Sequence, residues 1–296
     1  MPPIPPPTTE GTTATTAPLY WCRYTPPEPR GQLVVLHGGP GAHHDYLLPQ
    51  LLELAKERDC LFYDQRGGGR SRTDDRAPIT WRTHVEDLTA VLAELAPGPL
   101  SLVGYSWGAT LAMLYAIEAA AGRAGPVPTR MVLLDPGPAT REWRDEFEAE
   151  FQRRQTGPTV AALRDALAAS GLKQSDPAAY KQRAFELSVA GYFADPARAH
   201  DLTPFRVTGR VQQSVWESLG EFDLRPGLGT LQIPSLVVHG RQDPIPLESS
   251  EAVALALGAE TRWLDDCGHI PYVEQPGPLF AAVRDFLDRT DGGDLP

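Results

Sequence analysis

The sequence predicts an α/β protein built on a mostly parallel central sheet, with flanking helices and one long helical insertion. Short apolar runs alternate with helical periods along most of the chain, an order that requires parallel strands joined by right-handed crossovers. The alternation stops between about residues 141 and 229, where helical periods continue without a strand pattern. Glycine-rich or charged loops directly follow several predicted strands, so we expect these loops to meet at one edge of the sheet.

Length, charge and cysteine content restrict the possible classes of protein. The 296 residues exceed the size of an average domain, but α/β folds reach this length as one core with an insertion. The formal net charge of −11 argues against nucleic acids and anionic membrane surfaces as partners. Three cysteines without a close pair predict neither a disulfide framework nor a thiolate metal site.

Targeting and cofactor signals are not recognised in the sequence. The first seven residues lack a basic segment followed by an apolar one, and no run of eighteen apolar residues occurs, so we expect a cytoplasmic protein without a membrane partner. The glycine-rich loop at residues 64–71 lacks the Gly-Lys-Ser/Thr of a phosphate-binding loop, and no histidine spacing fits zinc. We therefore expect no cofactor and no metal. The sequence leaves the oligomeric state open.

The first half of the chain is expected to run from a solvated arm through the first core strands. Residues 1–18 are rich in proline and threonine and are expected to form a flexible arm, although residues 12–16 could pair as an edge strand. Residues 32–36 are apolar throughout, as in a strand that is buried on both faces. In order, we expect strands at residues 19–24 and 32–36, a helix at 46–58, a strand at 61–63, a helix at 81–95, a strand at 100–103, a helix at 109–116 and a strand at 131–134.

The second half interrupts and then completes the sheet. The insertion follows the sixth core strand and is expected to form a helical cap, residues 139–229, in which substrate selection would reside. The core of the fold is expected to comprise residues 19–138 and 230–296. Cap helices are expected at residues 143–153, 159–169, 177–189 and 208–219, followed by core strands at 234–238 and 260–264 and core helices at 247–257 and 279–287.

The segment Gly104-Tyr105-Ser106-Trp107-Gly108 lies between an apolar strand and a helix-forming run. Such a strand–turn–helix segment projects a serine hydroxyl clear of the backbone, and glycines are required where a Cβ would collide with the neighbouring strand or helix. The helix N-terminus next to Ser106 supplies unpaired N–H groups where an oxyanion would form. A buried serine at a tight turn would show the same pattern, so the assignment of Ser106 as a nucleophile depends on its partners.

A serine nucleophile needs an imidazole that takes its proton and a carboxylate that orients the imidazole. Ser106, Asp243 and His269 occur in this order along the chain, each just beyond a different predicted strand. Asp135, at the end of the strand before the insertion, is the competing acid. We therefore predict catalytic roles for Ser106, Asp243 and His269.

Two backbone N–H groups are expected to bind the oxyanion. One belongs to Trp107, directly after the nucleophile. The other is expected from the segment His37-Gly38-Gly39-Pro40-Gly41, whose three glycines and one proline require a fixed, unusual backbone path. Within this segment Gly39 is the preferred donor.

Other charged and imidazole residues near the strand ends are interpreted as structural. Asp64 and Arg66 are expected to brace the second glycine-rich loop, and a direct catalytic role is the alternative. His37 and His239 end strands beside glycines and are also expected to brace loops. The remaining histidines are interpreted as surface or helix residues: His43, His44, His84 and His200.

Four segments of the sequence resemble the α/β-hydrolases of the proline iminopeptidase (prolyl aminopeptidase) type. They are His37-Gly38-Gly39-Pro40-Gly41, Asp64-Gln65-Arg66-Gly67-Gly68-Gly69-Arg70-Ser71, Gly104-Tyr105-Ser106-Trp107-Gly108, and Gly268-His269 followed by Glu274-Gln275-Pro276. The resemblance extends over residues 31–290. It implies the α/β-hydrolase fold and a cofactor-independent serine peptidase or esterase, which often releases an N-terminal proline from small peptides.

In the family that the sequence resembles, cap glutamates bind the free amine of the substrate. Val215-Trp216-Glu217 looks like the segment that carries one of them, so Trp216 and Glu217 are candidate substrate-binding residues, and Glu221 is the alternative. A solvated position on a helix face is the structural interpretation of Glu217. Pro244 follows Asp243 where some family members have a glutamate. A carboxylesterase without amine recognition is therefore the second expected function, and a non-catalytic ligand-binding protein of this fold is the third.

Overall fold

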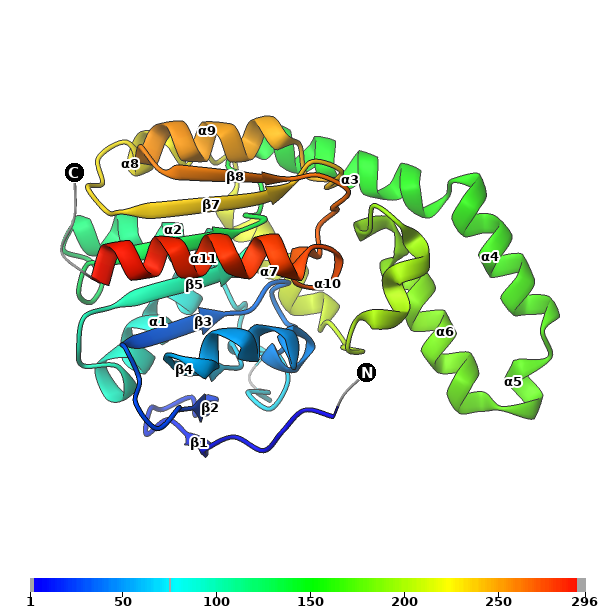
Figure 1. Ribbon diagram of the computed structural model, residues 1–296, viewed down its shortest axis with the longest axis horizontal. Helices are drawn as coiled ribbons and strands as arrows, with labels where there is room; N and C mark the ends of the chain where they lie inside the picture. The colour runs from blue at the N-terminus through cyan, green and yellow to red at the C-terminus, as the bar shows by residue number, and fades with distance from the viewer. Residues whose placement is uncertain (1–2, 75, 292–296) are drawn as a thin grey trace.

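An eight-stranded sheet forms the centre of the computed structural model, which describes residues 3–74 and 76–291 (Figure 1). The strands lie side by side in the order β1, β2, β4, β3, β5, β6, β7, β8. Residues 1–2 of the expected arm, and residues 75 and 292–296 of the expected core, lie outside the described residues. The strands are β1 (Thr9–Thr12), β2 (Tyr20–Tyr24), β3 (Gln32–Leu36), β4 (Asp59–Tyr63), β5 (Ser101–Tyr105), β6 (Arg130–Leu134), β7 (Ser235–Gly240) and β8 (Glu260–Leu264).

The sheet is mostly parallel, as predicted. Neighbouring strands from β4 to β8 run parallel, whereas β1 and β2 are antiparallel to their neighbours. The structure places Thr9–Thr12, which the sequence assigned to a solvated arm, in the sheet as its edge strand, with Thr9 opposite Arg23 and Thr12 opposite Tyr20. The edge strand therefore begins at Thr9 and not at residue 12.

Alternate side chains of the central strands pack into two apolar clusters, because successive side chains of a strand point to opposite faces. Val34 and Leu36 of β3 belong to one cluster, and Leu33 and Val35 belong to the other. β5 is buried over its full length. The continuous apolar character of these strands thus reflects burial on both faces of the sheet.

Helices cover both faces of the sheet. They include α1 (Trp81–Leu95), α2 (Trp107–Ala120), α9 (Leu247–Leu257), α10 (Pro271–Glu274) and α11 (Pro276–Asp291). The bounds predicted for α1 are confirmed. Its start is fixed by a capping box, in which the side chain of Thr80 accepts the N–H of Thr83 and the side chain of Thr83 accepts the N–H of Thr80.

The helix predicted at residues 46–58 is wrong. Two 3-10 helices, η1 (His44–Leu47) and η2 (Gln50–Lys56), occupy this part of the chain. Pro49 has no N–H to donate, and its ring disfavours helical backbone at Leu48, which is extended with ψ 149°. The apolar spacing that predicted one α-helix therefore belongs to two short 3-10 helices.

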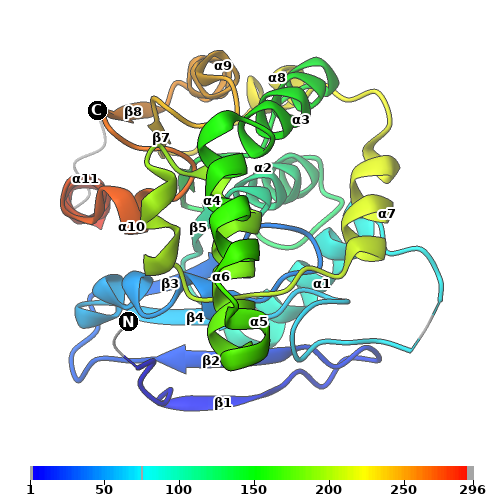
Figure 2. The same ribbon diagram turned by 90° about the vertical axis from the view of Figure 1, so that its right-hand side faces the viewer.

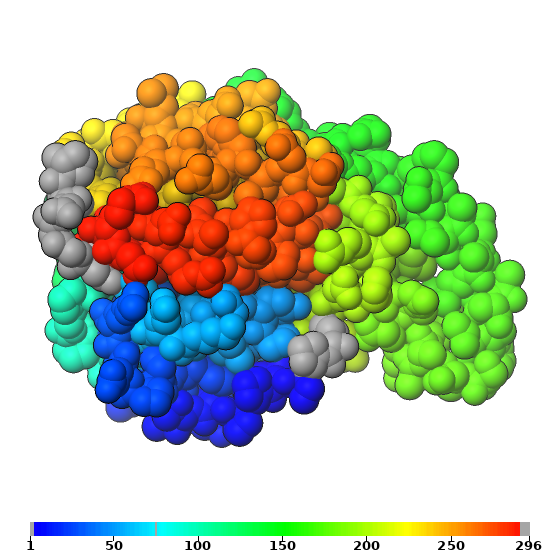
Figure 3. Space-filling model, in the orientation of Figure 1, coloured from blue at the N-terminus to red at the C-terminus, as the bar shows by residue number. Residues whose placement is uncertain are grey.

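The helical insertion, residues 139–229, leaves the sheet after β6 and returns to it before β7. Its middle part extends away from the sheet in Figure 1 and Figure 3, and Figure 2 shows α4 and α6 in front of the core. None of the helices within residues 3–74 and 76–291 has both the length and the apolar character that crossing a membrane requires. The insertion comprises α3 (Arg141–Gln155), α4 (Pro158–Ala169), α5 (Leu172–Ser175), α6 (Pro177–Val189), η3 (Ala190–Tyr192), η4 (Pro196–Asp201), α7 (Gly209–Leu219) and α8 (Arg225–Leu228).

Candidate active site

Three polar side chains meet where β5, β7 and β8 end. Ser106 directly follows β5, Asp243 lies in the loop after β7, and His269 lies in the loop after β8. Nδ1 of His269 is 2.7 Å from Oδ2 of Asp243, and Nε2 is 2.9 Å from Oγ of Ser106. The competing acid, Asp135, accepts the N–H of Gly240 at 2.9 Å. The structure thus brings together the three residues that the sequence selected.

Ser106 occupies a sharp turn between β5 and α2. Its φ of 54° and ψ of −119° lie outside the regions that residues with a side chain favour. A Cβ added to Gly104 would lie 2.5 Å from Cα of Ala109, and a Cβ added to Gly108 would lie 2.0 Å from the carbonyl oxygen of Leu36. The two glycines are required because the start of α2 packs directly on the backbone of β3 and β5.

Asp243 is ionised inside the protein. Its side chain is fully buried, and Oδ1 accepts the N–H of Ile245 at 2.7 Å. Burial raises the pKa of the Asp243 carboxyl, but the neighbouring imidazole of His269, together with the hydrogen bonds from His269 and Ile245, outweighs burial and lowers it. Asp243 therefore presents a negative charge to His269.

The helical insertion contacts His269 directly. The N–H of His269 donates to the carbonyl oxygen of Tyr192 at 2.7 Å, and the two rings stack with their centroids 5.2 Å apart. A Cβ added to Gly268 would lie 2.3 Å from the same carbonyl oxygen. Glu274 accepts the N–H groups of Gly268 and Ala194, at 2.7 and 2.8 Å, and so joins α10 to the insertion. The sequence did not indicate Tyr192, because its contact depends on the path of the insertion through space.

The two expected oxyanion donors lie next to the nucleophile. A Cβ added to Gly38 would lie 2.8 Å from Cβ of Ser106, so the loop at residues 37–41 touches the serine. Gly39 has a φ of +56°, which glycine adopts without strain. In the part of the chain that the structure describes, the backbone N–H groups of Gly39 and Trp107 donate no hydrogen bond. Among the described residues, neither N–H group therefore has an acceptor of its own.

The ring of Trp107 connects the two glycine-rich loops. Its Nε1–H donates to Oε1 of Gln65 at 2.9 Å, and Nε2 of Gln65 donates to the carbonyl oxygen of His37 at 2.8 Å. Nε2 of His37 accepts the N–H of Gln65 at 3.0 Å. Burial lowers the pKa of His37 to about 4, so its ring is neutral at pH 7 and can act as this acceptor. His37 braces the loop, as the sequence predicted.

Asp64 holds the second glycine-rich loop through a buried ion pair. Its Oδ1 accepts Nδ1–H of His44 at 2.6 Å, and its Oδ2 accepts the N–H of Arg70 at 2.8 Å. Burial disfavours the charged form of His44, but hydrogen bonds to Asp64 and Cys22 outweigh burial and raise the pKa of His44 to about 10. His44 lies in η1 with its side chain buried, and its partner, 20 residues further along the chain, was not expected from the sequence.

Arg66 ties the same loop to α1. Its Nε donates to Oδ2 of Asp87 at 2.9 Å, and its Nη2 donates to Oδ1 of the same carboxylate. Such a two-point contact fixes orientation as well as distance. The contacts of Asp64 and Arg66 favour the bracing interpretation over a direct catalytic role.

Asp64→Asn is expected to lower the free energy of unfolding by about 3–5 kcal/mol near pH 6, because it leaves the buried charge of His44 without its partner. The folded-state pKa of His44 lies above its unfolded value of 6.5, at about 10. Its stabilising contribution is therefore complete below pH 6.5 and is lost as the pH rises through 10. Denaturant unfolding at several pH values across this window checks both statements.

The matched control for this measurement is Asp145→Asn, which removes an exposed carboxylate paired with the exposed Arg141. Its effect should stay within about 1 kcal/mol, since exposed ion pairs contribute little. Equal effects of the two substitutions would contradict a buried, charged pair at Asp64 and His44.

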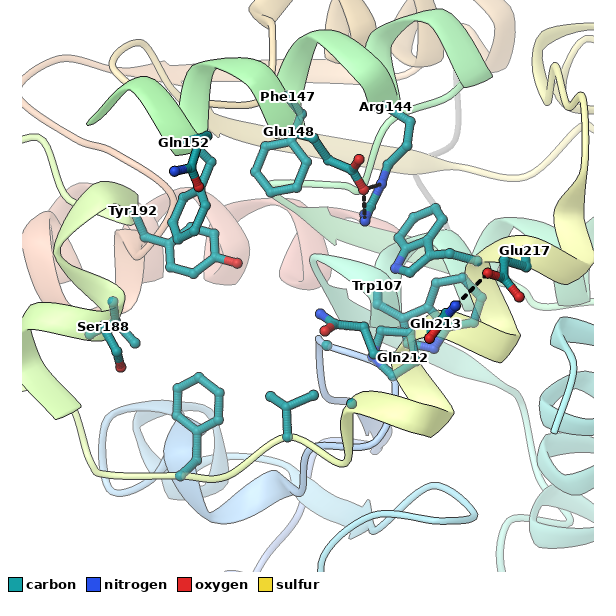
Figure 4. Close-up of a pocket in the computed structure, with 18 of the residues that line it drawn as sticks. Trp107, Arg144, Phe147, Glu148, Gln152, Ser188, Tyr192, Gln212, Gln213 and Glu217 are labelled. Atoms are coloured by element: carbon teal, nitrogen blue, oxygen red, sulfur yellow. Dashed lines mark hydrogen bonds and ion pairs between the residues drawn. The ribbon is translucent and has the colours of Figure 1, made fainter. Parts of the chain in front are cut away.

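A cavity of about 780 Å³ lies between the strand ends and the helical insertion (Figure 4). Gly39 and Trp107 form part of its wall, so the cavity reaches the residues beside the nucleophile. Arg144 and Glu148 enter it from α3 as an ion pair, with Nε of Arg144 2.7 Å from Oε1 of Glu148. The side chain of Arg144 is 15% exposed and lies over the ring of Trp216 at 4.2 Å. The cavity therefore contains a largely buried cation.

The expected substrate-binding residues differ in their relation to this cavity. Trp216 and Glu217 of α7 line it, whereas Glu221 is not among the described residues that do. The side chain of Glu217 is exposed, and its Oε1 accepts Nε2–H of Gln213 at 2.7 Å (Figure 4). The hydroxyl of Tyr192 points into the cavity from the opposite wall.

Arg144 and Glu148 are two of the lining residues that sequence reasoning missed. Their spacing of four residues on a helix is typical of a solvated surface pair. Packing against Trp216, which is 72 residues further along the chain, makes Arg144 part of the wall instead. Aromatic side chains form another part of the lining, where Phe147 and Phe151 of α3 pack near the ring of Tyr192.

Comparison with known proteins supports the sequence interpretation. A family described as "Alpha/beta hydrolase family" matches residues 33–283. The proline iminopeptidase of Lactobacillus crispatus (strain ST1) is 26% identical over 274 residues, which cover 88% of this chain and 90% of that protein. The proline iminopeptidase of Heyndrickxia coagulans is 26% identical over 270 residues, which cover 86% of this chain and 90% of that protein.

A solved structure of similar fold is the proline iminopeptidase of Mycobacterium smegmatis. It aligns with a TM-score of 0.69 and 22% identity, covering 96% of this chain and 99% of that chain. The recognition of a relationship to proline iminopeptidases, which rested on four short segments, is confirmed by these matches over most of the chain.

Proposed function

Because the chain belongs to the alpha/beta hydrolase family, we propose that it is a serine hydrolase that cleaves an amide or ester bond through an acyl-Ser106 intermediate. The observation that carries this proposal is the hydrogen-bonded series from Ser106 through His269 to Asp243. The N–H groups of Gly39 and Trp107, which donate to no acceptor among the described residues, support it, because an oxyanion needs donors at this point.

In the first half-reaction, Oγ of Ser106 attacks the substrate carbonyl carbon while Nε2 of His269 takes its proton. The carbonyl oxygen becomes an oxyanion and accepts hydrogen bonds from the N–H groups of Gly39 and Trp107. Asp243 stabilises the imidazolium that forms. When the carbonyl re-forms, the bond to the leaving group breaks, and His269 donates its proton to the departing nitrogen or oxygen.

In the second half-reaction, water attacks the acyl carbon with His269 again as the general base. The bond to Oγ of Ser106 breaks, and Oγ recovers its proton from His269. The product acid leaves, and the enzyme returns to its starting state.

The leading substrate class is a small peptide or amide with a free N-terminal proline or a similar residue. The similarity to proline iminopeptidases supports this choice. In this proposal the helical insertion acts as a cap that closes the 780 Å³ cavity over one small acyl group, and Glu217 faces the substrate amine from α7.

A carboxylesterase without amine recognition is the second candidate, and the charges of the cavity favour it. Arg144 is the largely buried charge there, and the carboxylate of Glu148 is already paired with it. The carboxylate of Glu217 is exposed and bonded to Gln213. A substrate ammonium would therefore have to compete with Arg144 or bind at the solvent-exposed edge.

One experiment tests the proposal as a whole. Purified protein is incubated with a fluorophosphonate probe, and hydrolysis of proline β-naphthylamide is compared with that of p-nitrophenyl acetate and butyrate. We expect labelling at Ser106 and a faster reaction with the proline amide. Labelling with faster ester hydrolysis would support the carboxylesterase. Absence of both labelling and hydrolysis would leave the non-catalytic ligand-binding protein.

Glu217→Gln is expected to lower kcat/KM for proline β-naphthylamide about five- to tenfold, at the lower end for a charge-assisted hydrogen bond because Glu217 is exposed. Hydrolysis of p-nitrophenyl acetate, which has no amine, should change less than twofold. Steady-state kinetics on both substrates gives the ratio, and the ratio separates amine recognition from a general loosening of the insertion.

Glu221→Gln is the comparator, because Glu221 lies on the same part of the insertion but not in the described cavity wall. We expect it to affect neither substrate. A selective loss with Glu221→Gln would transfer the amine-binding role to Glu221. An equal loss on both substrates with Glu217→Gln would remove Glu217 from that role.

A further inference from the structure

A second carboxylic acid lies against the acid of the Ser106, His269, Asp243 series. Asp135 directly follows β6, the neighbour of β7 in the sheet, and its side chain has no exposed surface. Oxygen or nitrogen atoms of Asp135, His239 and Asp243 lie within 4.8 Å of one another. The two carboxyl groups therefore share one buried, closely packed site.

The hydrogen bonds of Asp135 are incomplete. Its Oδ1 accepts the N–H of Gly240 at 2.9 Å, and its Oδ2 has no partner within the described residues. An ionised carboxylate needs several donors to be tolerated in the interior, whereas a neutral carboxyl group needs fewer. One donor for two oxygens is too few for an ionised carboxylate, and the second carboxyl group of this site, Asp243, adds charge repulsion to that shortage.

The neighbours of Asp135 supply no stable positive charge. His239 is the nearest imidazole, with Nδ1 3.6 Å from Oδ1 of Asp135. Its Nδ1 lies 3.0 Å from Oγ of Ser250 and its Nε2 lies 3.2 Å from the carbonyl oxygen of Ile245, and burial lowers the pKa of His239. A neutral ring satisfies both contacts, because Nε2–H donates to the carbonyl and Nδ1 accepts the hydroxyl.

The other titratable groups that act on Asp135 come from four elements or their adjoining loops. Burial is the largest influence, and the charge of Asp243 comes next; together they raise the pKa of Asp135 well above its usual value. The carboxyl group of Glu274 also raises the pKa of Asp135. The titratable groups that interact electrostatically with Asp135 are Tyr105 of β5, His239 of β7, Asp243, Cys267, and Tyr272 and Glu274 of α10.

We propose that Asp135 is a positioning residue that stays a neutral acid while Asp243 carries the negative charge of the site, and that Asp135 takes over this charge when Asp243 is neutralised. The inference rests on the proposed function, since it gives Asp135 a role through Asp243 and His269. With Asp243 uncharged, the charge repulsion that acts together with burial to keep Asp135 protonated disappears. The site then still holds one anion near His269.

The proposal makes the effect of Asp135→Asn depend on the residue at position 243. Asparagine has the size of a neutral aspartic acid and tolerates the φ of 40° at this position. In the otherwise unchanged protein, we expect the rate of fluorophosphonate labelling to fall less than about threefold. In the Asp243→Asn background, the same substitution should lower the remaining rate by about tenfold or more, because it removes the last anion of the site.

The pH dependence of labelling gives a readout that a purely structural role would not affect. The acid limb of this profile reports protonation of the base in the free enzyme. We expect Asp135→Asn to leave the limb within about 0.3 pH units of its original position, since a neutral group replaces a neutral group. If Asp135 were an anion, its removal would move the limb down by about one pH unit or more.

Thermal unfolding tests the charge state without any catalysis. A carboxyl group whose folded-state pKa is raised stabilises the fold fully below its unfolded value, near pH 4, and this contribution is lost as the pH rises. The Tm of Asp135→Asn should therefore exceed that of the original protein by a margin that grows from pH 5 to pH 9. A margin that stays constant, or that shrinks, would contradict a neutral Asp135.

Asp265→Asn is the matched control, because it removes an exposed carboxylate from the same group of loops. It should have no effect in either background. Equal effects of Asp135→Asn in both backgrounds would overturn the proposal. If Asp135→Asn does not fold, Asp135→Ala is measured in the same two backgrounds, with the same ratio expected. Failure of Ser106 to label in the unmodified protein would instead contradict the proposed function itself, so the two failures are distinguishable.

Discussion

Ser106→Ala is expected to abolish turnover and fluorophosphonate labelling while leaving thermal stability nearly unchanged. The substitution removes one hydroxyl, which is also the atom that bonds to Nε2 of His269. Loss of the nucleophile alone costs about 10⁶ in kcat in a well-studied serine hydrolase, nearly as much as loss of all three residues. Steady-state kinetics and gel-based labelling measure the loss, and thermal unfolding verifies that the variant is folded.

Ser170→Ala, which removes an exposed hydroxyl at the end of α4, is the control and should label normally. Retention of more than about one-thousandth of the original activity by Ser106→Ala would exclude Ser106 as the nucleophile, because bound substrate and oxyanion donors alone account for no more than this.

Asp243→Asn is expected to lower kcat by about four orders of magnitude, the effect described for the corresponding change in a serine protease. The carboxylate accepts Nδ1–H of His269 and the N–H of Ile245. An asparagine that keeps its oxygen on Ile245 turns its amide donor toward His269, which favours the tautomer that cannot take the proton of Ser106.

The pH profile distinguishes a wrong tautomer from a damaged fold. Asp243→Asn should keep a cooperative thermal transition, and its remaining activity should rise with pH as hydroxide replaces the lost base. Asp135→Asn alone is the comparator for position 243. A larger loss with Asp135→Asn than with Asp243→Asn would show that the acid of the site has been assigned to the wrong strand end.

Much of the architecture follows from sequence because its causes are local. The continuous apolar strands and the helical period of α1 are properties of neighbouring residues, and their positions were predicted closely. Ser106, Asp243 and His269 were found because parallel strands bring their carboxyl ends to one edge of a sheet. Residues far apart in the chain can be paired in this way without knowledge of any distance.

Most of the features that were not predicted from the sequence depend on contacts between distant parts of the fold. The wrong helix at residues 46–58 is the exception, because its cause is local. Pro49 favours an extended backbone at Leu48, and the apolar spacing of this segment does not reveal that effect. His44 finds Asp64, and Arg144 finds Trp216, only after the loops and the insertion are in place. β1 has little apolar character, and its position from Thr9 is set by pairing with β2.

The contact of Tyr192 with His269 limits how freely the two parts of this protein can be recombined. The carbonyl oxygen and the ring of one insertion residue orient the imidazole of a core residue. A chimaera that receives residues 139–229 from a relative would therefore inherit a different support for the imidazole of His269 along with a new cavity wall. Engineering of specificity should exchange wall residues such as Trp216 and Glu217 one at a time, and keep the segment around Tyr192 as part of the catalytic scaffold.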